Sequence, residues 1–175
     1  MQRNKTANIV RIGMFSAVTA VLSQIIIPMP SGIPVSLQTF AAALTGYVLG
    51  SGTGFFAILV YIMLGAVGIP VFSAFGAGPG VLFGTTGGFI WGFLILSIFC
   101  GFAVTRKNKV SISLFSAAGL LLCHLTGVIQ FSVIMKVKIP EAILLVSLPY
   151  LLKDGMSLLF AFMIGKKLRK QLHYL

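Results

Sequence analysis

The chain has 175 residues, of which 58% are hydrophobic and 9% are charged, and its mean hydropathy is +1.06. Soluble domains carry about 25% charged residues, so this chain has too little polar surface to cover a water-soluble globule. The composition excludes an ordinary soluble protein and predicts a single integral membrane domain over residues 1–175.

Apolar segments recur along the whole chain. A helix needs about 20 residues to cross the hydrocarbon core of a bilayer, although buried helices can be shorter. The sequence predicts an all-α membrane protein with six transmembrane helices, at residues 8–27, 36–49, 55–67, 88–104, 112–133 and 150–168. The second and third of these segments are short, and both are bounded by glycine-rich stretches.

Two apolar connections are rich in Gly and Pro and therefore form poor helices. They are "PMPSGIP" from Pro28 and "GIPVFSAFGAGPGVLFGTTGG" from Gly68. Non-helical backbone at membrane depth is tolerated only where it is buried in protein or lines a cavity. We therefore expect the second connection to fold over the bundle as a lid or cavity wall, with an ordinary external loop as the alternative.

The basic residues give the expected orientation. The chain has 13 basic and 2 acidic residues and a net charge of +11. Lys and Arg collect on cytoplasmic loops, and six spans with a cytoplasmic N-terminus put ten of the 13 basic residues inside. Both termini are thus predicted to be cytoplasmic, and the charge is interpreted as an orientation signal rather than a nucleic-acid footprint. The inner clusters are Arg3, Lys5 and Arg11, then Arg106, Lys107 and Lys109, and finally Lys166, Lys167, Arg169 and Lys170; Lys136, Lys138 and Lys153 lie outside.

No catalytic constellation is present, so we predict no enzyme, no metal site and no cofactor. The spans contain a single acid and hence no carboxylate pair, and no P-loop motif for ATP occurs. Cys100 and Cys123 lie in separate apolar runs and are interpreted as buried free thiols. His124 is the one histidine in a predicted span. We interpret it as bonding a neighbouring helix rather than relaying protons.

Asp154 is the strongest candidate for a functional residue, because an ionisable side chain inside a span is costly. It could contact a ligand, pair with Lys153, or cap the start of the last span. Adjacent helical side chains point about 100° apart, so pairing with Lys153 is not expected and ligand contact is favoured. Tyr150 and Ser157 share its helix face and would form one polar stripe. Three amides within apolar surroundings need hydrogen-bond partners: Gln24, Gln38 and Gln130.

Small residues recur in steps of four in the first span, as Gly13 and Ala17 and as Ser16 and Ala20. Such surfaces let membrane helices approach closely. The spacing alone leaves two readings equally open, a contact with another subunit and a contact with a neighbouring helix of the same bundle.

Three sequence blocks together resemble the BioY family of substrate-capturing S components of energy-coupling factor (ECF) vitamin transporters. They are "GIPVSLQTFAAALTGYVLG", "VYIMLGAVGIPVFSAFGAGPGVLFGTTGGFIWGF" and "LPYLLKD", which lie in this order between Gly32 and Asp154. The resemblance implies six helices with cytoplasmic termini in the plasma membrane of a prokaryote. It also implies an outward-facing pocket closed by the loops between helices one and two and between helices three and four.

The resemblance further implies what the protein captures and with what it assembles. The usual substrate is biotin, the first helix docks on a transmembrane coupling protein, and two ABC-type ATPases use the ATP. The docking residues would be Gly13, Ser16, Ala17 and Ala20. In the pocket, apolar side chains would supply burial and Asp154 would accept hydrogen bonds. The substrate-binding residues would be Asp154, Ser157, Lys153, Tyr150, Gln38, Phe72, Ala74, Phe75, Gly87, Gly88 and Trp91.

This chain departs from the family pattern at three positions. Ser157 stands where members carry a lysine, Ala74 where they often carry an asparagine, and Gln130 where a tryptophan is common. A missing asparagine suits a ligand without a ureido group, so lipoate or another small ring-bearing acid stays open beside biotin. Other functional alternatives are a stand-alone carrier, a membrane enzyme using Asp154 and His124, and a structural partner that binds no small molecule.

Overall fold

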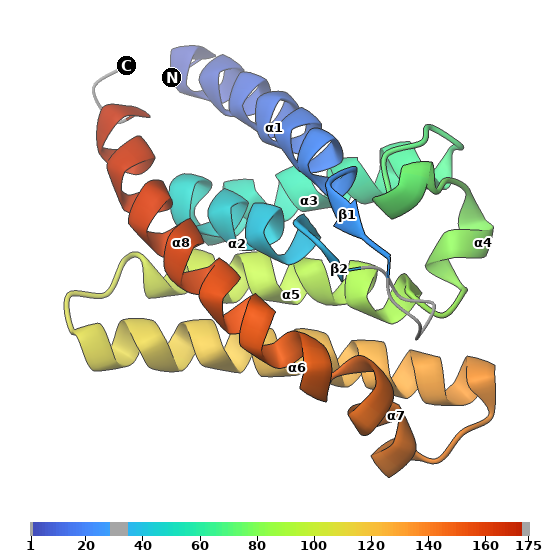
Figure 1. The fold of residues 1–175 in the computed structure, drawn as a ribbon. Coiled ribbons are helices and arrows are strands. Elements are labelled where there is room, and N and C mark those ends of the chain that lie inside the picture. The colour runs from blue at the N-terminus through green and yellow to red at the C-terminus, as the bar shows by residue number, and fades with distance from the viewer. Residues whose placement is uncertain (1, 29–34, 173–175) are drawn as a thin grey trace.

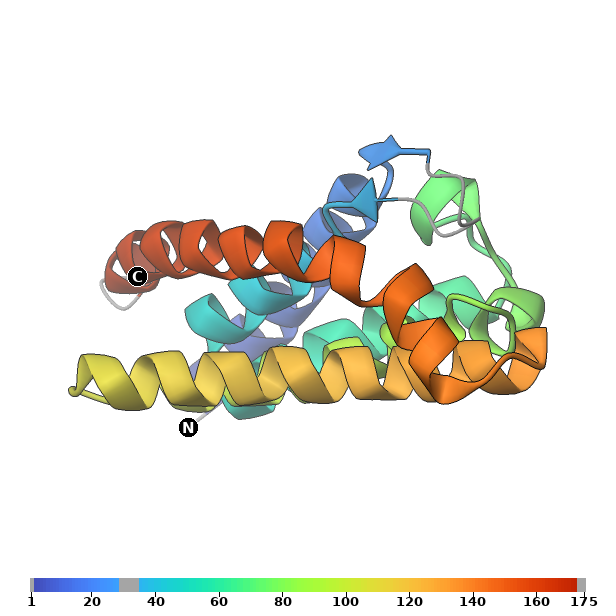
Figure 2. The same ribbon diagram turned by 60° about the horizontal axis from the view of Figure 1, so that its bottom comes forward.

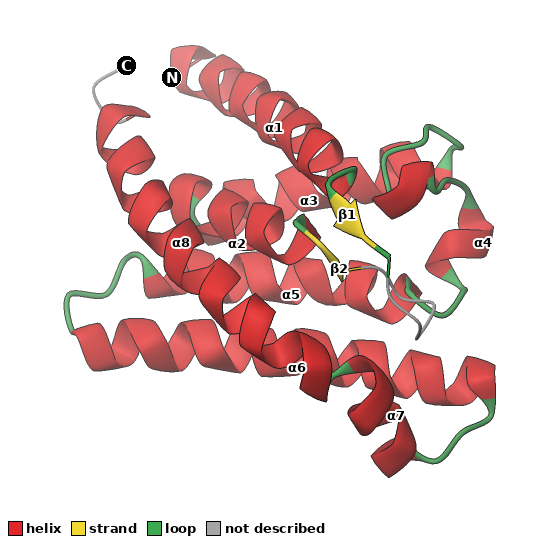
Figure 3. Cartoon of the chain, viewed as in Figure 1, coloured by secondary structure: helices red, strands yellow, loops and turns green. Residues whose placement is uncertain are grey.

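The computed structural model describes residues 2–28 and 35–172 and is predominantly helical, as predicted (Figures 1 and 3). Strands β1 (Ile26–Ile27) and β2 (Val35–Ser36) pair antiparallel, a small sheet that was not predicted. The loop predicted to close the pocket between spans one and two lies at residues 29–34, outside the described residues. The helices are α1 (Gln2–Ser23), α2 (Gln38–Leu49), α3 (Ser51–Ala66), η1 (Ser73–Phe75, a 3₁₀ turn), α4 (Pro79–Leu82), α5 (Gly87–Ala103), α6 (Lys109–Met135), α7 (Ile139–Val146) and α8 (Leu148–Leu172).

The six predicted spans correspond in order to α1, α2, α3, α5, α6 and α8, and the structure differs notably at the end of the first span and in one additional helix. The prediction that the first span continues to residue 27 was wrong, because α1 ends at Ser23 and the β-branched pair Ile26–Ile27 joins the small sheet. Helix α7 was not predicted either. Pro140 stands in its first turn, a position that needs no N–H, and Glu141 accepts a hydrogen bond from the Lys138 N–H at 3.4 Å.

Three helical stretches are long and apolar enough to cross a membrane, judged by length and composition among the described residues: Lys5–Ser23, Lys109–Met135 and Leu148–Gln171. Helices α3 and α5 are apolar but have only 16 and 17 residues. Exposed leucines and valines cover the outer faces of α6 and α8, including Leu114, Leu121, Val133, Leu152 and Leu159. Because water disfavours so much exposed apolar surface, this arrangement is that of a membrane protein.

Helix α2 lies at the centre of the bundle, in contact with α1, α3, α5 and α8. Almost every residue from Gln38 to Val48 is buried, which fits a sequence with no charged side chain. Figure 2 shows α6 along one side of the bundle and α8 along the other, joined at one end by α7. This arrangement brings the first turns of α2, α5 and α8 toward one another.

Glycines allow α5 and α6 to pack closely along most of their length. The ring of Phe89 in α5 lies over Gly127 of α6, and Gly92 of α5 faces the Cys123 backbone. Cys100 and Cys123 are buried free thiols, which confirms the interpretation from sequence. Glycines on both helices therefore bring α5 and α6 close together, and neither Gly92 nor Gly127 has room for a side chain of its own.

Candidate functional site

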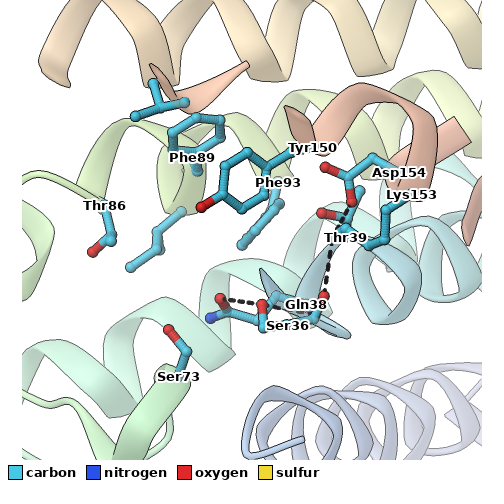
Figure 4. A pocket seen from close by; sticks show the side chains of 12 residues that line it. Ser36, Gln38, Thr39, Ser73, Thr86, Phe89, Phe93, Tyr150, Lys153 and Asp154 are labelled. Carbon is cyan, nitrogen blue, oxygen red and sulfur yellow. Dashed lines mark hydrogen bonds and ion pairs between the residues drawn. The ribbon is translucent and has the colours of Figure 1, made fainter. Parts of the chain in front are cut away.

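A cavity lies where α2, α5 and α8 begin (Figure 4). The empty space in it, including the open mouth, is about 450 Å³. One wall is apolar and the other carries charged and amide groups. The lining residues are Ser36, Gln38, Thr39, Ser73, Thr86, Phe89, Ile90, Phe93, Val146, Tyr150, Lys153 and Asp154.

Asp154 stands in the second turn of α8 and is only 4% exposed. Its Oδ2 lies 3.3 Å from His124 Nε2, and its Oδ1 is in direct contact with Lys153 Nζ. The expectation that Lys153 and Asp154 would not face each other was wrong. The Cα–Cβ directions do diverge, but the flexible four-carbon side chain of lysine bends back to reach the neighbouring carboxylate. The capping alternative does not hold, because α8 already begins at Leu148.

Lys153 joins the acid to the small sheet. Its ammonium also donates a hydrogen bond to the Ser36 carbonyl oxygen at 3.1 Å, and its side chain is 28% exposed. An ammonium has three N–H donors. With Asp154 and Ser36 as its two partners among the described residues, the third donor is available to a molecule in the cavity. The buried carboxylate is thus compensated by a cation that still faces the site.

His124 fixes the other carboxylate oxygen. Its Nδ1 lies 3.0 Å from Ser147 Oγ, at the junction of α7 and α8, and the edge of its ring meets Phe89 at a centroid distance of 5.7 Å. The interpretation that this histidine bonds a neighbouring helix is confirmed. Asp154 is therefore held from two sides, so its position does not depend on a ligand.

Gln38 presents a fixed amide to the cavity (Figure 4). Its Oε1 accepts a hydrogen bond from Ser36 Oγ at 3.0 Å, and its Nε2 donates to the Tyr61 hydroxyl at 2.8 Å. A primary amide has two N–H donors and two acceptor lone pairs. These two bonds set its orientation and, within the part of the chain that the structure describes, leave one donor and one acceptor site for a ligand.

The apolar wall comes chiefly from the first turns of α5. Thr86, Phe89, Ile90 and Phe93 follow one another at helical spacing and all line the cavity. Sequence reasoning missed them, together with Ser36, Thr39, Ser73 and Val146. The spacing marks a common face of α5, but only the packing shows that this face turns toward Asp154.

Comparisons with known proteins place these residues in a family. A family model described as the BioY family matches residues 1–174. The biotin transporter BioY of Thermotoga maritima is 34% identical over 163 residues, covering 93% of this chain and 95% of that protein. A probable biotin transporter BioY of Pyrococcus horikoshii is 34% identical over 165 residues, covering 94% and 98%.

The chain belongs to the BioY family. It is a membrane protein of a prokaryotic transport family and not an enzyme. The fold agrees with a crystal structure of the S component for biotin from an ECF-type ABC transporter, with a TM-score of 0.86 and 21% identity. That alignment covers 97% of this chain and 94% of the other.

Of the residues predicted to bind substrate in this BioY protein, Gln38, Tyr150, Lys153 and Asp154 line the cavity. Ser157 does not, although it is buried on the same face of α8 as Tyr150 and Asp154, so the predicted polar stripe exists. Because Ser157 lies one turn further into the bundle, it sits beyond the cavity wall.

The aromatic residues predicted to supply burial lie elsewhere. Phe72 lies in the connection between α3 and α5 (residues 67–86, hereafter the roof segment) and is fully buried, with its ring over Gly65 and edge-on to Tyr61. Phe75 is 70% exposed, and Trp91 is 37% exposed on the side of α5 away from the cavity. Phe89, Phe93 and Tyr150 supply the aromatic surface instead.

The remaining loop predictions also differ from the structure. Ala74 is exposed in a left-handed conformation with φ of 54° and does not line the cavity. Gly87 packs against Leu82 and Gln130, Gly88 packs against Gln130 and the α6 backbone, and neither lines the cavity. Of the long connection, Ser73 and Thr86 are the residues that reach the cavity.

The small residues of α1 separate into two faces. Gly13 and Ala17 are exposed, whereas Ser16 is only 1% exposed and Ala20 packs against the core. Ser16 and Ala20 thus lie on the face of α1 that packs within this chain. Gly13 and Ala17 form the open pair.

Gln130 anchors the end of the roof segment. Its Nε2 donates to the carbonyl oxygens of Leu82 and Gly84 at 2.9 and 2.8 Å, just where α4 ends.

Replacing Gln130 with Leu leaves these two carbonyls without their donor, which lowers the free energy of unfolding by about 1 kcal/mol for each. We expect Gln130→Leu to lower the thermal unfolding midpoint of the purified protein by several degrees. The exposed Gln171→Leu serves as control, and equal midpoints for the two variants would contradict this anchoring role.

Proposed function

We propose that this chain is the biotin-capturing S component of an ECF transporter in the plasma membrane. The observation that carries the proposal is the cavity itself, in which the Lys153–Asp154 pair and the Gln38 amide face the rings of Phe89 and Phe93. The relatives named biotin transporters support the same assignment.

The orientation follows from the placement of charge. In Figures 1 and 2, α1 begins, α8 ends and the connection from α5 to α6 turns at one end of the bundle. The predicted inner basic clusters belong to these segments, including Lys107, Lys109, Lys166 and Lys170. The cavity lies at the opposite end, where α2, α5 and α8 begin. With the basic end in the cytoplasm and α1, α2, α3, α5, α6 and α8 crossing the membrane, the cavity opens outward.

The chemistry of the two walls suits biotin. Biotin fuses an apolar sulfur-containing ring to a ureido ring. The sulfur-containing ring would pack on Phe89 and Phe93, and the ureido group needs both donors and acceptors. The remaining donor and acceptor of Gln38 match a ureido group, as the amide of asparagine would have done at position 74. The third N–H of Lys153 is available to the carboxylate of the ligand, in place of the lysine absent at position 157.

Transport in this proposal requires partner subunits. The exposed pair Gly13 and Ala17 on α1 offers a close-approach surface for a transmembrane coupling protein. Two ABC-type ATPases would use the ATP, so the chain itself would need no cofactor. The lipid bilayer surrounds the exposed apolar faces of α6 and α8.

Calorimetry of the purified protein tests the ligand. We expect tight binding of biotin, weaker binding of biotin amide, which lacks the carboxylate, and weak binding of lipoate, which lacks the ureido group. Tighter binding of lipoate than of biotin would mean that the substrate is lipoate or another small ring-bearing acid. Ala74 and Ser157, which replace the Asn and Lys of the family pattern, are the basis of that alternative. Absence of binding for all three would overturn it.

Reconstitution in vesicles tests the assembly. The proposal predicts uptake of labelled biotin only when the coupling protein, both ATPases and ATP are present. Uptake by this chain alone would instead support a stand-alone carrier. Gly13→Leu is expected to reduce uptake by the complete assembly without changing biotin affinity, since position 13 is exposed and far from the lining residues in sequence and fold.

A further inference from the structure

Two consecutive residues at the end of α1, Ser23 and Gln24, support two different walls of the cavity through hydrogen bonds. Ser23 is the last residue of the helix, and its hydroxyl lies 2.9 Å from the Tyr61 hydroxyl. Tyr61 in turn accepts the hydrogen bond that orients Gln38. Ser23 also donates to the Thr19 carbonyl oxygen at 2.6 Å, which fixes its own rotamer. The orientation of the Gln38 amide is therefore tied to α1 through one intermediate side chain.

Gln24, the next residue, holds the roof. Its Nε2 donates to the Phe72 carbonyl oxygen at 3.1 Å, and its Oε1 accepts from the Phe75 N–H at 3.0 Å. The same Nε2 lies 3.1 Å from the Ala20 carbonyl oxygen and 3.5 Å from that of Pro70. One amide thus uses both its donor and its acceptor to bracket the turn at residues 72–75.

That turn has a backbone that needs outside support. Ala74 and Phe75 have φ angles of 54° and 56°, the left-handed region that costs side-chain-bearing residues about 1 kcal/mol or more each. Such conformations persist where the surroundings over-determine them. The supports are the hydrogen bond from the Phe72 N–H to the Gly76 carbonyl oxygen at 3.0 Å, the buried Phe72 ring and the Gln24 amide.

The turn also contributes directly to the cavity. Ser73, between the two Gln24 contacts, is a lining residue, and Figure 4 shows it facing the same space as Gln38. The segment therefore joins a strained backbone, a cavity wall and the end of α1 within four residues.

We propose that Ser23 and Gln24 are positioning residues that hold the Gln38 wall and the Ser73 roof turn together, so that the end of α1 controls how long a ligand stays in the cavity. Neither residue lines the cavity, and both act through groups that do. A shift of the end of α1 removes both supports at once. The inference rests on the proposed function for the identity of the ligand alone.

Hydrogen exchange on the ligand-free full-length protein tests the roof contact independently of any ligand. We expect Gln24→Ala to speed exchange in peptides covering residues 70–78 by about three- to tenfold, because the Phe75 N–H loses its acceptor. Gln24→Glu keeps an acceptor oxygen and should preserve protection of that amide. Val21→Ala, an exposed position on the last turns of α1, is the matched control and should exchange like the wild type. Unchanged exchange in Gln24→Ala would overturn the proposal.

Dissociation kinetics test the consequence for a ligand. Biotin should leave Gln24→Ala about five- to tenfold faster and Ser23→Ala about two- to fivefold faster than the wild type, whereas Val21→Ala should match the wild type. A merely structural role would reduce the folded fraction but leave the dissociation rate of the folded protein unchanged, and that result would overturn the proposal. If the wild type failed to bind biotin, the proposed function would be wrong. The hydrogen-exchange experiment would still test whether Gln24 holds the turn at residues 72–75.

Discussion

Asp154→Asn is expected to weaken biotin binding about a hundredfold, a loss of about 2.7 kcal/mol. The substitution keeps the shape of the side chain but removes the charge that pairs with Lys153 and faces His124 Nε2 at 3.3 Å. Hydrogen bonds to charged groups contribute about 1.5–3 kcal/mol, and the Lys153 ammonium would lose the partner that holds it at the cavity wall. Calorimetry on the purified variant measures the change.

Ser157→Ala is the matched control for this prediction. Ser157 is only 7% exposed and lies on the same face of α8, one turn beyond Asp154, but it does not line the cavity. Its replacement should leave biotin affinity within about twofold of the wild type, because Ser157 makes no contact with the cavity. Equal affinity for Asp154→Asn and the wild type would mean that the acid serves the helix packing rather than the ligand.

Gly88→Ala is expected to destabilise the fold strongly. A Cβ atom at this position would overlap the Thr126 carbonyl oxygen and approach the Gly127 Cα and the Gln130 Cβ to 2.9 Å. Two of these three atoms are backbone, so α5 and α6 would have to separate. Overpacking of this kind costs about 1–3 kcal/mol and more where backbone must shift. The thermal unfolding midpoint should fall by several degrees, with a reduced yield of monodisperse protein.

The same substitution at Gly155 is not expected to lower the thermal unfolding midpoint. No atom lies within 4 Å of a Cβ built at this position in α8. Alanine is favoured over glycine in a helix by about 1 kcal/mol, so Gly155→Ala should keep or raise the midpoint. A similar midpoint for both variants would show that the α5–α6 crossing is looser than the structure indicates.

The membrane class and the order of the long helices followed from hydropathy, because a bilayer imposes one strong constraint on length and composition. The ends of the helices followed less well. Helix α1 stops at Ser23 because Ile26 and Ile27 pair with Ser36 and Val35, which follow the Pro-rich sequence 28–34 in the chain. Helix α2 could be read as a span by its apolar character, yet it is short because it is enclosed by other helices.

The polar part of the site was accessible from sequence because charge and amide groups are rare in this chain. Asp154, Lys153, Gln38 and Tyr150 were each singled out, and each lines the cavity. The apolar part was not, since phenylalanines are common here and nothing local separates Phe89 from Phe72. Phe72 fills the space over Gly65, and Phe89 faces the cavity, as a result of how the roof segment folds.

By itself, then, the sequence determined the membrane class, the family and the presence of an acid that had to be held inside the bundle, because each depends on composition or on short motifs. Only the tertiary structure decided that Lys153 bends back onto Asp154, that His124 reaches it from α6, and that Gln24 supports the roof. These contacts join side chains from separate helices, or depend on the rotamer of a flexible chain. Their geometry is set by packing, which leaves no signature in the order of residues.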